Sequence, residues 1–202
     1  MYYVVYDNFL RADEFGRLKG YLGPDGEFPW KLGSRINNND QRNDDMYFAT
    51  NIYHAYSGWA NHFGQHILEA IDAVSTKLHI EALFRIKANM YFPSRTGKVV
   101  HHAPHIDADF YHQGALFFLT TCDAPTTMAD GTPIESIENR LLLFDPVTNH
   151  SSSSPTNAPF RQTINFNYFG AGINKNYKDR MVNPIPILSK NAEKLDEFWV
   201  KS

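Results

Sequence analysis

The stretch that decides the fold and the chemistry of this chain runs from His105 to Arg161. It begins with His105-Ile106-Asp107 and continues to Leu141-Leu142-Leu143-Phe144-Asp145-Pro146-Val147-Thr148-Asn149-His150. Arg161 follows in Phe160-Arg161-Gln162-Thr163-Ile164-Asn165-Phe166. Two imidazoles and one carboxylate can hold one face of an octahedral Fe(II) ion and leave the opposite face open. The stretch therefore contains the ligand types of a non-haem iron centre.

The spacing of these residues indicates which of them can meet at one metal ion. Alternate side chains of an extended strand share a face, so His105 and Asp107 are expected to point the same way. Two histidines lie downstream of Asp107, namely His112 and His150. His112 is only five residues on and would need an immediate reversal of the chain. His150 follows a long excursion and the apolar run 141–144, which predicts a separate strand, so His150 is the predicted third ligand.

The segment after His150 predicts a strand with two different faces. A strand with one polar and one apolar face, late in a β-rich region, is typical of a barrel whose interior binds a polar ligand. Arg161 can hold a carboxylate through two hydrogen bonds, with the Thr163 hydroxyl beside it. A single arginine on such a strand is more often an ordinary exposed residue, and the triad upstream reverses that weighting. The polar face carries Arg161, Thr163, Asn165 and Asn167, and the other face carries Phe160, Gln162, Ile164, Phe166 and Tyr168.

With these residues the chain resembles the 2-oxoglutarate/Fe(II)-dependent dioxygenases. The resemblance is greatest to the prolyl-4-hydroxylase-like branch, which includes members from phages and marine bacteria. The family pattern is His-x-Asp, a distal His, Arg or Lys about ten residues on, and Ser or Thr two residues after that. It is matched here by His105, Asp107, His150, Arg161 and Thr163. The resemblance implies that the first three bind iron and that the last two bind the co-substrate.

Other segments extend the resemblance over most of the chain, most strongly from about Phe84 to Phe169. The family often has a tyrosine that touches the co-substrate on the strand before the first ligand, and Tyr91 has that place. Residues 130–144 resemble the loop and strand that lead to the distal His, and residues 2–10 resemble the strand that opens the domain. Where many hydroxylases have a Gly-Gly turn, this chain has Asp-Ala-Pro-Thr-Thr at 123–127.

The fold that the resemblance implies is α+β and mainly β. Its core is a double-stranded β-helix, a jelly-roll of the cupin type, with about eight strands in two facing sheets. Helices from the first third of the chain would support one sheet. We expect a single oxygenase domain over residues 1–202, with a strand, helices and a polar loop in 1–82, the catalytic β core in 83–169, and a tail in 170–202.

Composition agrees with one domain and excludes several classes of protein. The chain has 202 residues, of which 43% are hydrophobic, and this is enough for a sizeable core. The single Cys122 excludes an internal disulfide, favours a reducing compartment, and is expected to be a buried inert thiol. No signal peptide or membrane span is evident, so a soluble cytoplasmic protein is expected, in the host cytoplasm if a phage encodes it. The formal net charge of −3 provides no basic surface for nucleic acid.

Hydrophobic patterning predicts the remaining elements. The polar segment Gly33–Asp45 is too polar to pack and is read as a loop, either disordered or a lid. The segment Ser151–Ser154 is interpreted as a connecting turn. His62 and His66 are one turn apart on a predicted helix and are interpreted as surface or packing residues. Helices are expected from near Arg11, from 57 to 78 and from 191 to 200, and strands at 2–6 and between 84 and 168.

The resemblance implies Fe(II), 2-oxoglutarate and O2 as cofactor and co-substrates, with ascorbate as a candidate supporting reductant. The expected reaction is hydroxylation of a C–H bond with release of succinate and CO2, because Asp107 is present and halogenating relatives lack this carboxylate. The expected partner is a peptidyl proline or a small amino-acid-like substrate, and the oligomeric state is left open. Oxidative demethylation of nucleic acid and a non-catalytic jelly-roll binding protein remain alternatives. Candidate substrate contacts are Trp30, the 35–45 loop, Tyr47, Asn89, Tyr111 and His112, whereas His101 and His102 are interpreted as ordinary positions.

Overall fold

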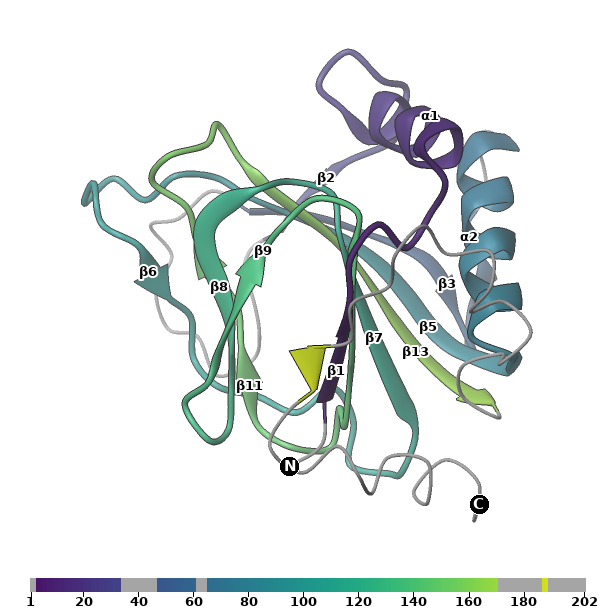
Figure 1. Ribbon diagram of the computed structural model, residues 1–202. Helices are drawn as coiled ribbons and strands as arrows, with labels where there is room; N and C mark the ends of the chain where they lie inside the picture. The colour runs from purple at the N-terminus through teal and green to yellow at the C-terminus, as the bar shows by residue number, and fades with distance from the viewer. Residues whose placement is uncertain (1–2, 34–46, 61–64, 171–186, 189–202) are drawn as a thin grey trace.

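A computed structural model describes residues 3–33, 47–60, 65–170 and 187–188 of the chain (Figure 1). The described part consists of a large antiparallel sheet, a three-stranded sheet, a strand pair and two helices. The helices are α1 (Ala12–Leu22) and α2 (Gln65–Lys77). The strands are β1 (Tyr3–Tyr6), β2 (Lys31–Leu32), β3 (Tyr47–His54), β4 (Gly58–Trp59), β5 (Ile80–Tyr91), β6 (Val100–His101), β7 (Gln113–Phe118), β8 (Cys122–Met128), β9 (Pro133–Ser136), β10 (Arg140–Phe144), β11 (His150–Ser151), β12 (Ser153–Ser154), β13 (Arg161–Gly170) and β14 (Ile187–Leu188).

The strand order confirms the predicted two-sheet architecture. The large sheet has the order β14-β1-β10-β7-β13-β5-β3-β2, with β4 attached to β3. The smaller sheet has the order β11-β8-β9, and β6 pairs with β12. In Figure 1 the smaller sheet faces one side of the large sheet, and both helices cover the other side. This is a mainly β jelly-roll with helices supporting one sheet, as the sequence predicts.

Two apolar clusters explain why the sheets and helices pack in this way. The outer cluster joins the helices to the large sheet, with Leu18 of α1, Ile71 of α2 and Ile164 and Phe166 of β13 among its members. The inner cluster lies between the two sheets and includes Phe118 and Phe144 of the large sheet with Met128 and Ile134 of the small one. Because side chains alternate along a strand, the outward apolar residues of β13 leave Arg161, Thr163, Asn165 and Asn167 facing the inside.

The first helix begins where the sequence predicts, and the second begins later. The Arg11 amide donates to Glu14 Oε2 at 3.0 Å, which supports the first turn of α1. The prediction of a helix from residue 57 is wrong at its start, because Gly58 has a φ of +73° and pairs through β4 with the end of β3. Gly58–Trp59 therefore closes a hairpin, and α2 is described from Gln65 onwards. Strand β3, which the sequence did not predict, supplies the neighbour of β5.

Two further predictions are corrected in the small sheet. Residues 123–127 lie within strand β8 and form part of the sheet. The segment Ser151–Ser154 contributes to the short strands β11 and β12 as well as connecting them, because its residues pair with β8 and β6. The predicted loop at 34–45, His62 and the predicted helix at 191–200 lie outside the described residues. The division of residues 1–202 into parts of one domain stays a prediction.

Candidate metal centre

The fold brings His105, Asp107 and His150 together. Their potential ligand atoms all lie within 4.8 Å of one another. His105 and His150 form an isolated antiparallel bridge, in which each backbone amide donates to the other's carbonyl at 3.0 Å. The Asp107 amide donates to the Pro146 carbonyl at 2.9 Å, so the same two segments are joined again two residues later. The long excursion between Asp107 and His150 therefore returns to pair with its own starting point.

The two imidazoles are oriented so that one nitrogen of each faces the carboxylate. His150 Nδ1 lies 3.0 Å from the Thr148 carbonyl oxygen, and its Nε2 lies 4.0 Å from Asp107 Oδ2. His105 Nε2 lies 4.0 Å from Asp107 Oδ1, and its ring also hydrogen-bonds to the backbone of Ala103. Donation from one ring nitrogen to a carbonyl fixes the tautomer and leaves the other nitrogen as a lone-pair donor. Three converging ligand atoms suit one divalent metal ion.

The Asp107 carboxylate is held by three side chains of the large sheet. Arg85 Nη2 donates to Oδ1 at 2.8 Å, and Asn167 Nδ2 donates to Oδ2 at 2.8 Å. Asn165 Nδ2 lies 3.3 and 3.1 Å from the two oxygens. These three residues follow the alternation of β5 and β13, with Asn167 directly opposite Arg85 in the register. The carboxylate is therefore fixed in position before any metal binds.

Asn167 links this network to a buried histidine. Its Oδ1 accepts from Arg85 Nε at 3.0 Å, and its Nδ2 also lies 3.2 Å from His112 Nε2. His112 is 1% exposed, and its Nδ1 lies 2.8 Å from the Phe110 carbonyl oxygen. Nδ1 is then the donor and Nε2 the acceptor of the Asn167 amide. His112, a candidate substrate contact from sequence, thus positions the residue that holds Asp107.

Electrostatics keep two of the candidate ligands, His105 and Asp107, in the protonation states that a metal needs. Burial lowers the pKa of His105 to about 4, with a further lowering from His150 and an opposing effect of Asp107. Burial alone would raise the Asp107 pKa, but His150, Arg85 and the amides of Asn167 and Asn165 outweigh it, and the Asp107 pKa lies below its usual range. A neutral imidazole and an ionised carboxylate are the ligating forms.

Arg161 is a fully buried guanidinium. Its Nε donates to Ser136 Oγ and its Nη2 to Thr126 Oγ1, both at 2.7 Å, and Nη1 lies 3.4 Å from the Ser153 carbonyl oxygen. All three partners are neutral, and among the described residues no carboxylate lies within ion-pair distance of Arg161. Burial lowers its pKa, although guanidinium stays protonated in proteins. The fold therefore encloses a positive charge, and some N–H donors of this guanidinium remain without a hydrogen-bond acceptor among the described residues.

Tyr91 and Thr163, the other two residues predicted to bind the co-substrate, are placed near Arg161 by the strand pairing and by the alternation along β13. Tyr91 is directly opposite Arg161 in the register of β5 and β13, and the guanidinium carbon lies 5.5 Å from the centre of the Tyr91 ring. Thr163 is buried on the same strand, two residues from Arg161. The Tyr91 ring also stacks on His102 at 5.2 Å. Arg161, Tyr91 and Thr163 thus form one polar and aromatic group on the inner face of the large sheet.

The interpretation of His102 as an ordinary position is incomplete. Its ring is 3% exposed, and its two nitrogens lie 2.8 Å from Ser152 Oγ and 3.1 Å from Ser154 Oγ. The Tyr91 hydroxyl hydrogen-bonds to Ser152 as well. His102 therefore couples the strand pair β6–β12 to the tyrosine beside Arg161. Sequence offered no periodic signal for it, because it follows a two-residue strand.

The other candidate contacts lie in three different places. Trp30 donates its Nε1 to the Leu22 carbonyl at 3.1 Å and packs on Phe28 in the helical layer, so its role there is structural. Tyr47 donates its hydroxyl to Asn89 Oδ1 at 2.6 Å and stacks on Tyr91 at 5.1 Å, which places it on the inner face. Tyr111 is half exposed.

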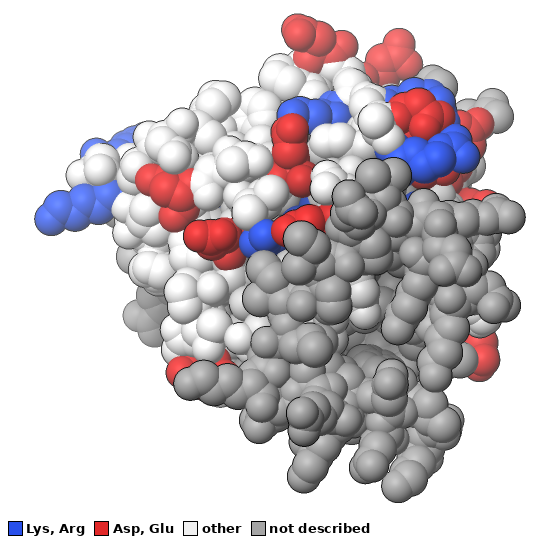
Figure 2. Space-filling model, in the orientation of Figure 1, with Lys and Arg blue, Asp and Glu red and all other residues white. Residues whose placement is uncertain are grey.

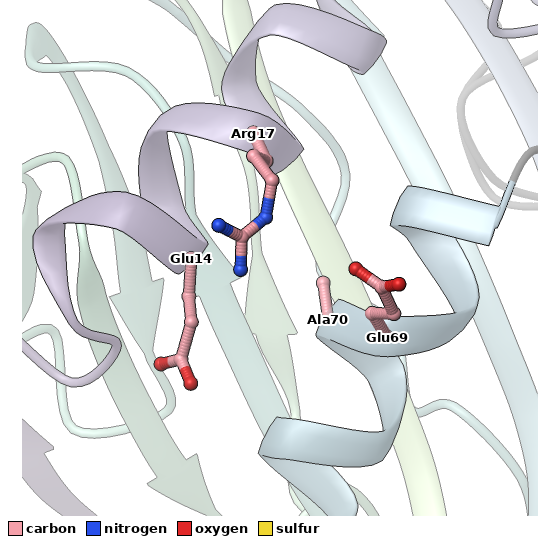
Figure 3. Close-up of a pocket in the computed structure, with 4 residues that line it drawn as sticks. All are labelled: Glu14, Arg17, Glu69 and Ala70. Atoms are coloured by element: carbon pink, nitrogen blue, oxygen red, sulfur yellow. The ribbon is translucent and has the colours of Figure 1, made fainter.

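A separate pocket of about 220 Å³ lies between the two helices (Figure 3). It is lined by Glu14 and Arg17 of α1 and by Glu69 and Ala70 of α2. It therefore lies on the helical side of the large sheet, whereas Arg161 and Asn165 face the other side. Charged surface side chains and an alanine give this pocket no catalytic group comparable with the triad.

Comparison with known proteins identifies relatives of the fold. No protein-family model and no curated protein matches the chain. Among solved structures, a prolyl hydroxylase from Trichoplax adhaerens in complex with a hypoxia-inducible factor peptide fragment superposes with a TM-score of 0.55 and 19% identity, covering 83% of each chain. A Pseudomonas putida prolyl-4-hydroxylase gives 0.50 and 14%, covering 83% of this chain and 92% of that one. A Burkholderia pseudomallei oxidoreductase of the 2OG-Fe(II) oxygenase family gives 0.54 and 12%, covering 81% and 82%.

The chain therefore has the jelly-roll fold of 2OG-Fe(II) oxygenases. Prolyl hydroxylases are among the proteins that share it. At these identities the similarity concerns the fold, and function has to be argued from the site itself. Among the described residues, no helix is long and apolar enough to cross a membrane.

Proposed function

We propose that this protein is an Fe(II)- and 2-oxoglutarate-dependent dioxygenase that hydroxylates a C–H bond. One observation carries the proposal. A cluster of two histidines and one carboxylate lies on the same inner surface as a buried arginine that has no carboxylate partner among the described residues. The first feature suits Fe(II), and the second suits the free carboxylate of a bound dicarboxylate.

Two groups of residues would have separate roles, one in binding the metal and the other in binding the co-substrate. His105 Nε2, His150 Nε2 and an Asp107 oxygen would hold the metal, while Arg85, Asn165 and Asn167 keep the Asp107 carboxylate ionised and aimed. Arg161 would bind the distal carboxylate of 2-oxoglutarate, with Tyr91 and Thr163 beside it. The buried surroundings exclude water, which strengthens these contacts. Fe(II) with 2-oxoglutarate supplies the chemistry, in which O2 is reduced, the co-substrate becomes succinate and CO2, and one oxygen atom enters the substrate as a hydroxyl group.

The substrate class is narrowed by the fold relatives and the charges. The Trichoplax adhaerens enzyme is a prolyl hydroxylase bound to a peptide fragment, which supports a peptidyl proline or a related amino-acid-like substrate here. Nucleic acid is disfavoured, since basic and acidic side chains are interspersed on the face shown in Figure 2 and the net charge is −3. A jelly-roll that binds ligands without turnover remains the competing function. We expect the protein to work in the cytoplasm, with ascorbate as a supporting reductant.

An anaerobic titration tests the proposal. The metal-free protein is titrated with Fe(II) and 2-oxoglutarate while the visible metal-to-ligand charge-transfer band is recorded. We expect a band that saturates near one equivalent in the unchanged protein and is absent in Asp107→Ala, which loses the carboxylate ligand. Circular dichroism of both proteins controls for folding. A folded unchanged protein that forms no band would support the non-catalytic function.

A further inference from the structure

Lys87 is a cation of the inner surface that the proposed function does not use. It lies on β5 between Arg85 and Asn89, and directly opposite Asn165 in the register. Because Asn165 donates to the Asp107 carboxylate, this register places the Lys87 side chain next to the triad. The side chain is partly buried, and burial followed by the charge of Arg85 lowers the Lys87 pKa to about 8.

The Lys87 ammonium has no hydrogen-bond acceptor and no carboxylate within ion-pair distance among the described residues. Its recorded contact is with the Tyr47 ring, whose centre is 5.4 Å from Nζ. The nearby carboxylate of Asp107 is already paired with Arg85 at 2.8 Å. Lys77, another buried lysine of the described chain, does have such partners. Lys77 Nζ donates to the Phe9 carbonyl at 2.8 Å and lies 3.7 Å from Glu14.

A second group on this surface also lacks a partner. Asn165 Oδ1 is buried and accepts no hydrogen bond from the described residues, since its amide nitrogen is directed to Asp107. A donor without an acceptor and an acceptor without a donor thus stand on paired positions of β5 and β13. A buried polar group without a partner is costly, so such pairs are expected where a ligand completes them.

The co-substrate does not account for Lys87. Arg161 is opposite Tyr91, and Lys87 is four residues from Tyr91 along β5, which separates the two backbone positions by about 13 Å. A five-carbon diacid has its ends joined by four carbon–carbon bonds of about 1.5 Å each. One carboxylate of such a diacid would be bound by Arg161 and the other by the metal, so no third anionic group is left for Lys87.

We propose that Lys87 binds the carboxylate of the substrate, and that the substrate is a free amino acid or a close analogue of one. Asn165 Oδ1 would accept a hydrogen bond from the substrate's nitrogen. The proposal rests on the proposed function and chooses between its two substrate types, because an internal proline of a peptide has no free carboxylate. The inner positions of β3, β5, β7 and β13 that flank Lys87 carry no acidic side chain, so the substrate would supply the missing negative charge.

The test measures binding without turnover. The protein is loaded anaerobically with Fe(II) and 2-oxoglutarate, and the charge-transfer band is followed as the twenty protein L-amino acids are added, each compared with its own carboxamide. A doubly capped Ala-Pro-Gly peptide and O-phosphoethanolamine are added separately. We expect at least one free amino acid to perturb the band and to bind about 30-fold more tightly than its carboxamide, which corresponds to about 2 kcal/mol.

Three variants assign the effect to Lys87. Lys87→Met removes the charge at similar length and is expected to weaken the acid about 30-fold while changing 2-oxoglutarate affinity by less than about threefold. Lys87→Arg keeps the charge and is expected to retain the preference for the acid, which also controls for a folding defect. Lys19→Met makes the same chemical change on the exposed surface of α1 and is expected to have no effect.

Each contrary result has a defined meaning. A normal charge-transfer band that no free amino acid perturbs would overturn the inference while leaving the proposed function intact. The inference would also be overturned if the carboxamides, the capped peptide or O-phosphoethanolamine bound more tightly than the free amino acids. A loss of 2-oxoglutarate affinity in Lys87→Met would make Lys87 a co-substrate residue. Absence of the band from the unchanged protein would instead count against the proposed function.

Discussion

Replacement of Arg161 by methionine separates a ligand-binding arginine from a structural one. Arg161 uses three hydrogen-bond donors on Ser136, Thr126 and Ser153, and guanidinium has five. The two that remain can hold one carboxylate through charge-assisted hydrogen bonds of roughly 1.5–3 kcal/mol each. We therefore expect Arg161→Met to cost about 3–4 kcal/mol of 2-oxoglutarate binding, a weakening of roughly 100- to 1,000-fold.

The stability of the ligand-free protein is expected to change little in this variant. Methionine removes a buried cation that has no counter-charge among the described residues, and this gain offsets the lost hydrogen bonds. Ser136 Oγ remains satisfied because it donates to the Ala124 carbonyl at 2.6 Å. Arg140→Met is the matched control, since Arg140 is 5% exposed and paired with Asp7 at 2.6 and 2.9 Å. That variant is expected to lower the free energy of unfolding by about 1–3 kcal/mol and to leave 2-oxoglutarate affinity unchanged.

The assay combines anaerobic calorimetry of 2-oxoglutarate binding to the Fe(II) protein with urea unfolding of the metal-free protein. Metal affinity is measured separately and is expected to be similar in Arg161→Met and the unchanged protein. Unchanged 2-oxoglutarate affinity in Arg161→Met would refute the reasoning. A large loss of stability in that variant would show that the guanidinium is a structural residue.

Three smaller predictions concern residues that support the site and the fold. Asn167→Ala removes one of the hydrogen bonds that hold the Asp107 carboxylate, so we expect Mn(II) to bind about 10- to 100-fold more weakly. A spin-resonance titration measures this affinity, and equal Mn(II) affinity in the variant and the unchanged protein would contradict the positioning role of Asn167. Asn139→Ala removes buried hydrogen bonds to the Leu10 amide and carbonyl at 2.9 and 2.8 Å, from a residue with a φ of +58°. It should cost about 2–4 kcal/mol of unfolding free energy, and a change below the error of urea unfolding would count against it. His102→Phe keeps a ring against Tyr91 but loses both serine contacts, so we expect 2-oxoglutarate affinity to fall about fivefold while metal affinity is unchanged. Weaker metal binding with unchanged 2-oxoglutarate affinity would refute the coupling of His102 to the tyrosine beside Arg161.

Much of the inner surface could be predicted from alternation along single strands. The polar face assigned to residues 161–167 is the face that meets Asp107, through Asn165 and Asn167. The same rule applied to residues 85–91 would have found Arg85 and Lys87, because polar residues alternate there with Ile86, Ala88 and Met90. That signal is present in the sequence itself.

Other features could not be read from one sequence because they depend on pairing between distant segments. Strand β3 became evident only through its register with β5. Thr126 lies in a segment that looks like a loop because of Pro125, yet its hydroxyl accepts from Arg161 across the barrel. His112 and His102 are separated from Asn167 and Ser152 by 55 and 50 residues. Contacts of this kind follow from the order of strands in the sheets, which hydrophobic periodicity does not specify.

Five buried or partly buried cations of the described chain show how the fold distributes positive charge, namely Lys77, Arg85, Lys87, Arg140 and Arg161. A buried ion costs several kcal/mol unless a counter-charge and hydrogen bonds compensate it. Lys77 and Arg140 are compensated by Glu14 and Asp7.

Arg161 and Lys87 have no such carboxylate among the described residues, and both face the inside of the sheet that holds Asp107. A divalent metal on the triad would add two positive charges, and 2-oxoglutarate would remove two. Asp107 would balance Arg85, and the distal carboxylate of 2-oxoglutarate would balance Arg161. Before substrate binds, one positive charge would then remain at the metal and one at Lys87. The electrostatics of this surface therefore favour an anionic substrate over a neutral one.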